Sequence, residues 1–255
     1  MTTASRPLAL ITGASSGIGA EFARRYAREG VDLLLAARSG PVLQALADEL
    51  SAAHEITATV HTADLAQAQD VSRLAAVIDE LPRLDHLVAS AGTAPEGDLD
   101  RMDPDELRRM IDINVTALSL LTRAAIIRMR RAGSGTIITI ASGAGYQPLP
   151  HFAAYAASKA YVIRFTEALS EEHRRHGLRI FSVAPGDTET PMNPGAARAK
   201  RQAHQVVETA WRAMPTTAPS VIDGGRNRLV AVLATRVLGT RLGLRIAERA
   251  MRAKA

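Results

Sequence analysis

Six short apolar runs alternate with longer stretches of helical pattern, an order that few folds can accommodate. Parallel strands need a crossover connection, usually a helix, whereas antiparallel strands can be joined by short turns. The alternation therefore predicts βαβ units that build one doubly wound parallel sheet with helices on both faces, an α/β fold. The expected strands cover residues 8–12, 31–36, 56–61, 84–89, 136–140 and 178–184.

The helical stretches between these runs have recognisable ends. Asp103 can cap a helix whose first residue is Pro104, and Gly133 can stop it. After Pro185 the pattern loosens, and the segment that follows, with one helical stretch around Trp211, is interpreted as a lid or substrate loop. We expect helices over residues 17–29, from 41, from 67, over 103–131 and over 153–176.

Composition excludes several classes of site. The chain has no cysteine, which rules out disulfides and thiolate metal sites, and its seven histidines lack metal-type spacing, so no metal is expected. No secretory signal or membrane-spanning run is recognisable, and we expect a cytoplasmic protein. Residues 225–255 hold eight basic residues and one acid, so the basic charge belongs to this tail. We therefore expect no nucleic-acid partner.

A glycine-rich turn follows the first expected strand. Its sequence, Thr12-Gly-Ala-Ser-Ser-Gly-Ile-Gly19, lies where a strand passes into a helix. Backbone N–H groups at a helix N-terminus bind phosphate, and glycines let the backbone approach it closely. The turn alone is a weak signal, because a tight βα connection also needs glycines. It predicts a dinucleotide site at this edge of the sheet.

Tyr155 and Lys159 form the most specific pair in the sequence. The chain has only three lysines and four tyrosines, so this spacing of one of each is uncommon by chance. Residues four apart lie on one face of a helix. An ammonium near a phenol favours the phenolate, which suits a group that must exchange a proton near neutral pH.

Together, the glycine turn and this pair resemble the short-chain dehydrogenase/reductase superfamily. Its signature, Thr-Gly-x-x-x-Gly-x-Gly followed by Ser and Tyr-x-x-x-Lys, is matched in order by residues 12–19, Ser142 and residues 155–159. The resemblance covers roughly the first 190 residues. It implies a Rossmann-type fold and an oxidoreductase that transfers a hydride between a nicotinamide cofactor and a carbonyl or secondary alcohol.

The resemblance also implies roles for individual residues. Tyr155 would exchange a proton with the substrate oxygen and Ser142 would polarise that oxygen. Lys159 would lower the pKa of Tyr155 and hold the nicotinamide ribose, and Asn114 would join the lysine to solvent through water. The catalytic set is Asn114, Ser142, Tyr155 and Lys159. The expected cofactor contacts are Thr12, Gly13, Ser15, Ser16, Gly17, Ile18, Gly19, Arg38, Asp64, Leu65, Ala91, Gly92, Tyr155, Lys159, Pro185, Gly186, Thr188 and Thr190.

The end of the second strand favours NADP(H) over NAD(H). An acidic residue there would bond the ribose hydroxyls of NAD(H), but the chain reads Ala36-Ala37-Arg38. Arg38 can pair with the 2′-phosphate of NADP(H). In the family's pattern Asp64 would meet the adenine, although an aspartate before a helix can also be a cap.

Two positions depart from the family's pattern. Many relatives have Asn-Asn-Ala-Gly after the fourth strand, where this chain has Ala89-Ser-Ala-Gly92, and this puts the sheet-bracing role of the asparagine in doubt. Thr188 stands where an aliphatic residue is usual, while Thr190 matches the threonine that contacts the nicotinamide amide. His151 and Phe152, just before Tyr155, either line the pocket or lie on the surface.

We expect one domain, with a Rossmann-type catalytic part over residues 1–225, including the substrate loop at 186–225, and a basic amphipathic helical extension over residues 226–255. The extension can make a peripheral contact with the inner face of a membrane, cover the pocket, pack at a subunit contact or form an ordinary solvated helix.

The expected substrate is a small carbonyl compound, which the protein would reduce to its alcohol. The expected oligomeric state is a homodimer or homotetramer. Two alternatives stay open: a non-catalytic, dinucleotide-binding regulatory protein of the same fold, and a membrane-recruited reductase of lipid or acyl substrates.

Overall fold

Seven parallel strands form the central layer of the protein, which a computed structural model describes over residues 6–194, 200–233 and 240–252. The strand order is β3-β2-β1-β4-β5-β6-β9, and a separate two-residue pair joins β7 to β8. The strands are β1 (Leu8–Thr12), β2 (Asp32–Ala37), β3 (Ala58–Thr62), β4 (His86–Ala89), β5 (Gly135–Ile140), β6 (Leu178–Ala184), β7 (Thr188–Glu189), β8 (Arg201–Gln202) and β9 (Ser220–Ile222).

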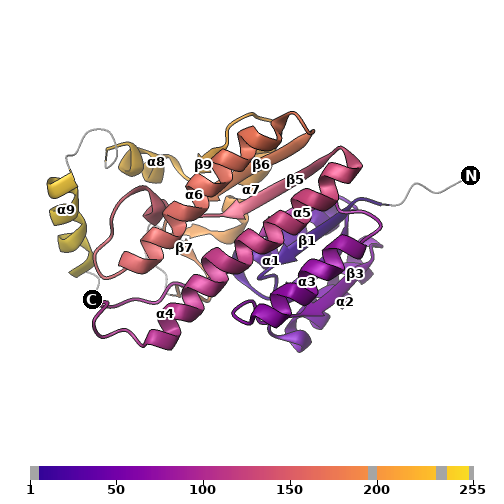
Figure 1. The fold of residues 1–255 in the computed structure, drawn as a ribbon, viewed down its shortest axis with the longest axis horizontal. Coiled ribbons are helices and arrows are strands. Elements are labelled where there is room, and N and C mark those ends of the chain that lie inside the picture. Colours follow the sequence, from indigo (N-terminus) through magenta and orange to yellow (C-terminus); the bar gives the residue numbers. More distant parts are fainter. Residues whose placement is uncertain (1–5, 195–199, 234–239, 253–255) are drawn as a thin grey trace, which may run out of the picture.

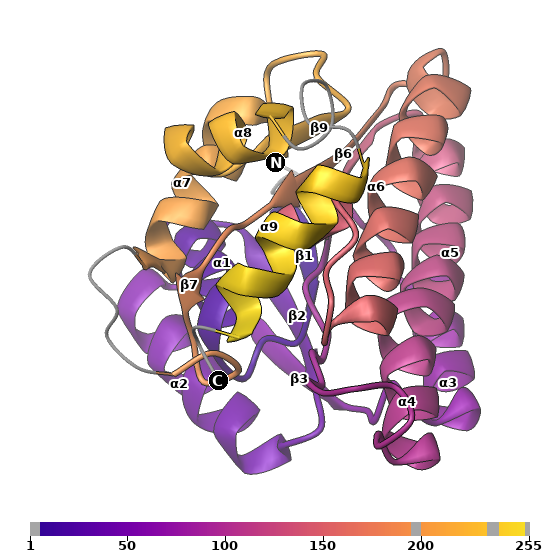
Figure 2. The ribbon, with the colours of Figure 1, turned by 90° about the vertical axis from the view of Figure 1, so that its left-hand side faces the viewer.

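Helices cover both faces of this sheet, with α1, α2 and α7 on one side and α3, α5 and α6 on the other (Figures 1 and 2). A π-helical segment, η1, joins α4 to α5 without a break. The helices are α1 (Gly17–Arg28), α2 (Gly40–His54), α3 (Ala68–Glu80), α4 (Pro104–Ile111), η1 (Asp112–Ala117), α5 (Leu118–Ala132), α6 (Ala153–Arg174), α7 (Ala203–Ala213), α8 (Gly225–Val232) and α9 (Thr240–Arg252), with a 3₁₀ turn, η2, at Gly143–Tyr146.

Alternation along the strands explains why both faces are covered. In β1, Ile11 packs into the cluster of α1, α2 and α7, whereas its neighbour Leu10 packs into the cluster of α3 and α5. Successive side chains of a strand point to opposite faces, so a strand that is apolar throughout must be buried on both. The predicted doubly wound parallel α/β sheet is therefore confirmed.

The rod formed by α4, η1 and α5 begins as expected, because Oδ1 of Asp103 accepts the N–H of Asp105 at 2.9 Å and Pro104 is the first helical residue. The stretch Pro104–Ala132 is also apolar and long enough to cross a membrane. Half of its most apolar 18-residue stretch is buried in the fold, as in an ordinary core helix. A single helix of this kind is weak evidence for a membrane span.

Within the segment at 186–225, which was predicted as a lid or substrate loop, the helix α7 packs against the rest of the fold. The ring centroid of Trp211 in α7 lies 5.0 Å from that of Tyr26 in α1, and Val206 and Ala210 of α7 are fully buried. This helix is therefore part of the layer that covers the sheet. Farther along, β9 pairs with β6 as a seventh strand that was not predicted, because three residues are too short to show a pattern.

Successive strands are added on one side of β1 up to β3 and on its other side from β4 onwards. Thr12, the last residue of β1, pairs with Ala36 of β2 on one side and with Ala89 of β4 on the other. In doubly wound sheets this change of side opens a crevice at the carboxyl ends of the strands, where ligands bind. The helix α9 crosses in front of this edge (Figure 2).

Candidate active site

The glycine turn between β1 and α1 presents its backbone to the carboxyl edge of the sheet. Gly13 and Gly17 have φ angles of 68° and 55°, which residues with side chains rarely adopt. A Cβ at Gly13 would lie 2.8 Å from Cα of Ala91, and one at Gly19 would collide with the carbonyl oxygen of Gly13. The first turn of α1 holds no acid, and the hydroxyl of Ser16 does not cap it. These features fit a bound phosphate group.

The hydroxyl of Thr12 holds the segment that follows β4. Its Oγ1 accepts the N–H groups of Ser90 and Ala91, each at 3.2 Å. Thr12 therefore braces this segment at Ser90, one of the two positions where the asparagines of the family's pattern are absent. A Cβ at Gly92, two residues on, would lie only 3.4 Å from Nζ of Lys159. This segment therefore runs between the glycine turn and the lysine.

Asn114 anchors the same segment from the opposite side. It is fully buried in η1; its Oδ1 accepts the N–H of Thr93 at 2.9 Å, and its Nδ2 donates to the carbonyl oxygen of Thr93 at 2.9 Å and to Oγ of Ser158 at 3.1 Å. Short π-helical segments are frequent at functional sites. Neither Thr93 nor Ser158 was predicted, because their hydrogen bonds with Asn114 join distant parts of the sequence. The water link from Asn114 to the lysine stays a prediction.

Tyr155 and Lys159 lie near the N-terminal end of α6. Nζ of Lys159 lies 5.8 Å from the centroid of the Tyr155 ring and donates a hydrogen bond to the carbonyl oxygen of Ile140 at 2.9 Å. Lys159 is 5% exposed, and its burial lowers its pKa to about 8. Part of the lysine population is therefore neutral in mildly alkaline solution.

The pKa of Tyr155 moves in the direction opposite to the one expected from the sequence. Burial raises it, and a hydrogen bond with Ser142 offsets this only in part. Desolvation of the phenolate dominates the shift, and the nearby ammonium directs its hydrogen bond to a backbone carbonyl instead. In the protein alone Tyr155 thus holds its proton firmly.

Ser142 begins the η2 turn after β5. Its Oγ accepts the N–H of Ala144 at 3.2 Å, and the next residue, Gly143, donates its N–H to the carbonyl oxygen of Pro185 at 2.7 Å. The carboxyl ends of β5 and β6 are joined at this point. The predicted catalytic serine and the Pro185-Gly186 segment are therefore brought together.

The segment after β6 folds over the glycine turn. A Cβ at Gly17 would lie 3.2 Å from Cγ2 of Thr190, and the buried hydroxyl of Thr188 donates to the carbonyl oxygen of Gly186 at 3.1 Å. The hydroxyl of Thr188, the residue that departs from the aliphatic side chain of the family's pattern, thus makes its hydrogen bond within its own turn.

Charged side chains gather at the ends of β2 and β3. Arg38 is exposed, and the structure gives it no ion pair among the described residues. Asp64 accepts two hydrogen bonds from Arg109 of α4, at 2.8 and 3.1 Å, and one from the N–H of Ala66 at 3.1 Å. Leu65, beside it, is buried. Asp64 is therefore paired with a residue that the sequence did not single out.

His151 links three segments around the site. Its Nδ1 lies 2.7 Å from Oδ1 of Asp98, and its Nε2 lies 3.1 Å from Oε2 of Glu248 in α9. The pKa of His151 is raised, first by the hydrogen bond with Asp98 and then by Glu248. The ring of the next residue, Phe152, packs edge-on against Tyr155 with centroids 6.1 Å apart.

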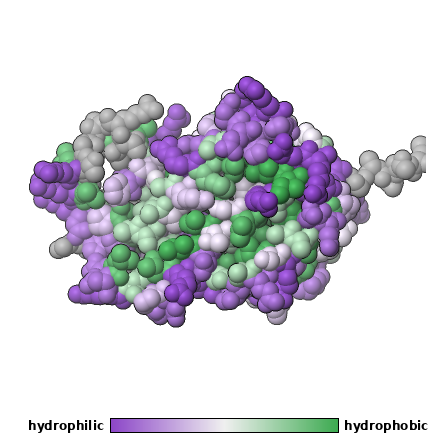
Figure 3. Space-filling model, viewed as in Figure 1, coloured by the Kyte–Doolittle hydropathy of each residue, from purple (hydrophilic) through white to green (hydrophobic). Residues whose placement is uncertain are grey.

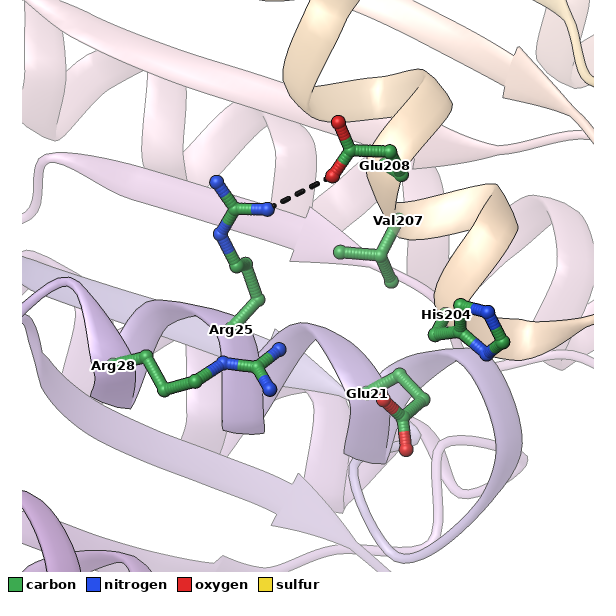
Figure 4. A pocket seen from close by; sticks show the side chains of 6 residues that line it. All are labelled: Glu21, Arg25, Arg28, His204, Val207 and Glu208. Carbon is green, nitrogen blue, oxygen red and sulfur yellow. Dashed lines mark hydrogen bonds and ion pairs between the residues drawn. The ribbon is translucent and has the colours of Figure 1, made fainter.

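Two cavities lie outside this cluster. One, of about 270 Å³, lies between α1 and α7, where Arg25 is paired with Glu208 at 3.0 Å (Figure 4). The other, of about 500 Å³, is apolar and is lined by the loop at 145–150, Leu244 of α9 and four alanines of α6. These alanines, at 153, 156, 157 and 160, share one helical face that does not include Tyr155.

The chain matches known proteins over most of its length. Residues 7–201 match the family model described as short chain dehydrogenase. A sulfoacetaldehyde reductase of Chromohalobacter salexigens is 40% identical over 192 residues, which cover 72% of this chain and 73% of the relative.

Two solved structures superpose on nearly the whole chain. A short-chain dehydrogenase from Sphingobium yanoikuyae in complex with NADPH has a TM-score of 0.83 and 28% identity, covering 98% of this chain and 96% of its own. The bulky-bulky ketone specific alcohol dehydrogenase from Comamonas testosteroni has a TM-score of 0.81 and 27% identity, covering 99% and 96%.

Proposed function

Because this chain belongs to the short-chain dehydrogenase family, whose members interconvert alcohols and carbonyl compounds with a nicotinamide dinucleotide, we propose that it is an NADP(H)-dependent reductase of ketones or aldehydes. The observation that carries the proposal is the cluster of Ser142, Tyr155 and Lys159 at the carboxyl edge of the sheet, beside the glycine turn.

The side chains divide the reaction between them. The nicotinamide, when bound, supplies the hydride that the carbonyl carbon receives. Tyr155 donates the proton that the carbonyl oxygen needs, while the hydroxyl of Ser142 donates a hydrogen bond to that oxygen and polarises it. Lys159, whose pKa is lowered to about 8 and whose Nζ lies 5.8 Å from the ring centroid of Tyr155, would favour loss of that proton by its charge. It would also supply the proton that restores Tyr155, through an intervening hydroxyl group or water. Asn114 holds the segment after β4 in place through its two hydrogen bonds with the backbone of Thr93.

Arg38 supports the choice of NADP(H). Its guanidinium follows β2 directly, is exposed, and has no ion pair among the described residues, so it can pair with a 2′-phosphate. The first turn of α1 and the glycines at 13, 17 and 19 would hold the pyrophosphate. Cells keep NADP(H) mainly in its reduced form, and we therefore propose that the enzyme reduces the carbonyl compound.

The test is steady-state oxidation of NADPH and NADH with a panel of ketones and aldehydes. We expect kcat/KM to be at least about tenfold higher with NADPH, and Arg38→Ala to bring the two values within about threefold of each other. Equal or faster turnover with NADH in the wild type would reject the cofactor proposal. An absence of turnover with every substrate and both cofactors would instead favour the regulatory alternative.

A surface at the C-terminus supports a second proposal, contact with an anionic membrane. Half of the large exposed apolar side chains of the described chain lie in α8, directly after it or in α9: Leu229, Val230, Val232, Leu233, Leu242 and Ile246. Between them are five exposed arginines, Arg226, Arg228, Arg241, Arg245 and Arg249. The acid of this surface, Glu248, is paired with His151. Each arginine near an anionic bilayer contributes about 1 kcal/mol to binding.

Sedimentation with vesicles tests this contact. The protein should sediment with vesicles that contain phosphatidylglycerol and stay in the supernatant with pure phosphatidylcholine, because cations and apolar side chains must act together. The double variant Leu242→Glu with Ile246→Glu should lose the binding, whereas Val42→Glu, which changes an exposed apolar residue of α2, should keep it. No sedimentation with either vesicle would remove the membrane proposal and leave the reductase proposal intact.

The proposed homodimer or homotetramer has a candidate surface over α4, α5 and α6. Exposed apolar residues on these helices are Ile111, Leu120 and Tyr161. The face that carries the helices shows apolar areas surrounded by hydrophilic ones (Figure 3). Apolar patches with a polar rim are typical of subunit contacts, and analytical ultracentrifugation would give the state.

A further inference from the structure

Three charged residues surround the carboxyl ends of β2 and β3: Arg38 follows β2, Asp64 follows β3, and Arg109 belongs to α4. The N–H of Ala63 donates to the carbonyl oxygen of Ala37 at 3.0 Å, so the residues that follow, Arg38 and Asp64, start from neighbouring points. The third is Arg109, which reaches Asp64 from α4 through two hydrogen bonds. Arg38 belongs to the expected 2′-phosphate site, whereas no pattern in the sequence connects Arg109 with the cofactor.

The Asp64–Arg109 pair is held in a defined geometry. The two side chains are 27% and 31% exposed, and the guanidinium approaches both carboxylate oxygens at 2.8 and 3.1 Å. Burial alone would raise the pKa of Asp64, but the hydrogen bonds of Arg109 and Ala66, together with the charges of Arg109 and Arg38, bring it below its ordinary value. Arg109 thus compensates the charge of the Asp64 carboxylate. Arg38 is close enough for its charge to lower the pKa of Asp64 as well.

An uncompensated carboxylate at this position would oppose NADP(H) in two ways. It would attract the free guanidinium of Arg38, and it would repel the 2′-phosphate, which carries negative charge. The neighbouring acid, Asp70, is already paired with Arg73 and accepts the backbone N–H of Asp64. Arg109 is therefore the side chain whose guanidinium occupies both carboxylate oxygens of Asp64.

We propose that Arg109 is a positioning residue for cofactor choice: by holding Asp64 in an ion pair, it leaves Arg38 free to bind the 2′-phosphate of NADP(H). The proposal rests on the NADP(H) preference proposed above. Arg109 would thus affect binding of the phosphate through Asp64. The affinity for NAD(H), which lacks the phosphate, should depend little on Arg109.

Dissociation constants for NADPH and NADH, measured by calorimetry with Arg109→Ala, test the proposal without any substrate. We expect the Kd for NADPH to rise about tenfold and the Kd for NADH to change less than about twofold. Arg108→Ala is the matched control, since Arg108 is the exposed neighbour on α4 and should leave both constants unchanged. An equal rise of both constants for Arg109→Ala would overturn the proposal, because a residue that only shapes the adenine site affects the two cofactors alike.

The double variant Asp64→Asn with Arg109→Ala separates action through Asp64 from direct contact with the phosphate. Asparagine keeps an oxygen for the N–H of Ala66 and removes the charge, so the Kd for NADPH should return to within about threefold of the wild type. Failure of this rescue would also overturn the proposal. A wild type that binds NADH more tightly would reject the proposed NADP(H) preference, while the effect of Arg109 on the ratio of the two constants would still be measured.

Discussion

Lys159 is a cation in an almost water-free position. Its ammonium has one hydrogen bond, to the carbonyl oxygen of Ile140, and its pKa falls from 10.5 to about 8 because the charge is desolvated. The folded pKa lies below the unfolded one, so between these values the unfolded state binds more protons and stability rises with pH.

Replacing Lys159 by methionine should remove this pH dependence. Between about pH 7 and about pH 9.5, the free energy of unfolding of the wild type should rise relative to that of Lys159→Met by about 2 kcal/mol. Urea unfolding of both proteins at several pH values measures the difference, in which the other titrating groups cancel. A constant difference across this range would show that the lysine keeps an ordinary pKa.

The Tyr155–Lys159 pair was predicted from its spacing only in part. The spacing of Tyr155 and Lys159 predicted that both side chains lie together on α6, and they do. It predicted the wrong direction for the pKa of Tyr155, because that value depends on burial by distant segments. Likewise Arg109 was missed, since its partner Asp64 lies in another element.

At the scale of elements, long periodic segments were predicted well and short ones were not. The helix from Asp103 and the strand at residues 178–184 have strong local signals and appear as expected. The strand β9 and the covering role of α7 depend on contacts with β6 and α1, which the local sequence does not encode. The burial of α7 could not be predicted, because the aromatic residue that Trp211 contacts lies in another helix.

The connection between β1 and α1 is the element whose geometry is most demanding. In Gly19→Ala, the new Cβ would collide with the carbonyl oxygen of Gly13, and the turn must open. We expect the Kd for NADPH to rise at least about tenfold, as measured by calorimetry. Gly225→Ala is the control, because a Cβ at Gly225 meets no atom within 4 Å and should leave the constant unchanged. Equal constants for Gly19→Ala and the wild type would contradict the assignment of this turn to the cofactor.

At the scale of the whole molecule, the helix α9 lies beside the edge of the sheet that carries the candidate site. Glu248 in α9 reaches His151, almost a hundred residues earlier, and Leu244 closes one side of the apolar cavity. The sequence indicated an amphipathic basic segment but not its place, because many arrangements satisfy the same pattern. Part of that expected stretch, residues 234–239 and 253–255, lies outside the described residues.

Tyr155 is the proposed general acid of a carbonyl reductase, and Tyr155→Phe tests this role most directly. Turnover of NADPH with the best ketone or aldehyde should fall at least about 100-fold, while the Kd for NADPH stays within about twofold of the wild type. Tyr161→Phe, which removes the exposed hydroxyl that bonds to Ser119 on the outside of α6, should retain full turnover. Turnover within about threefold of the wild type in Tyr155→Phe would contradict the account, since general acid catalysis cannot survive the loss of its acid.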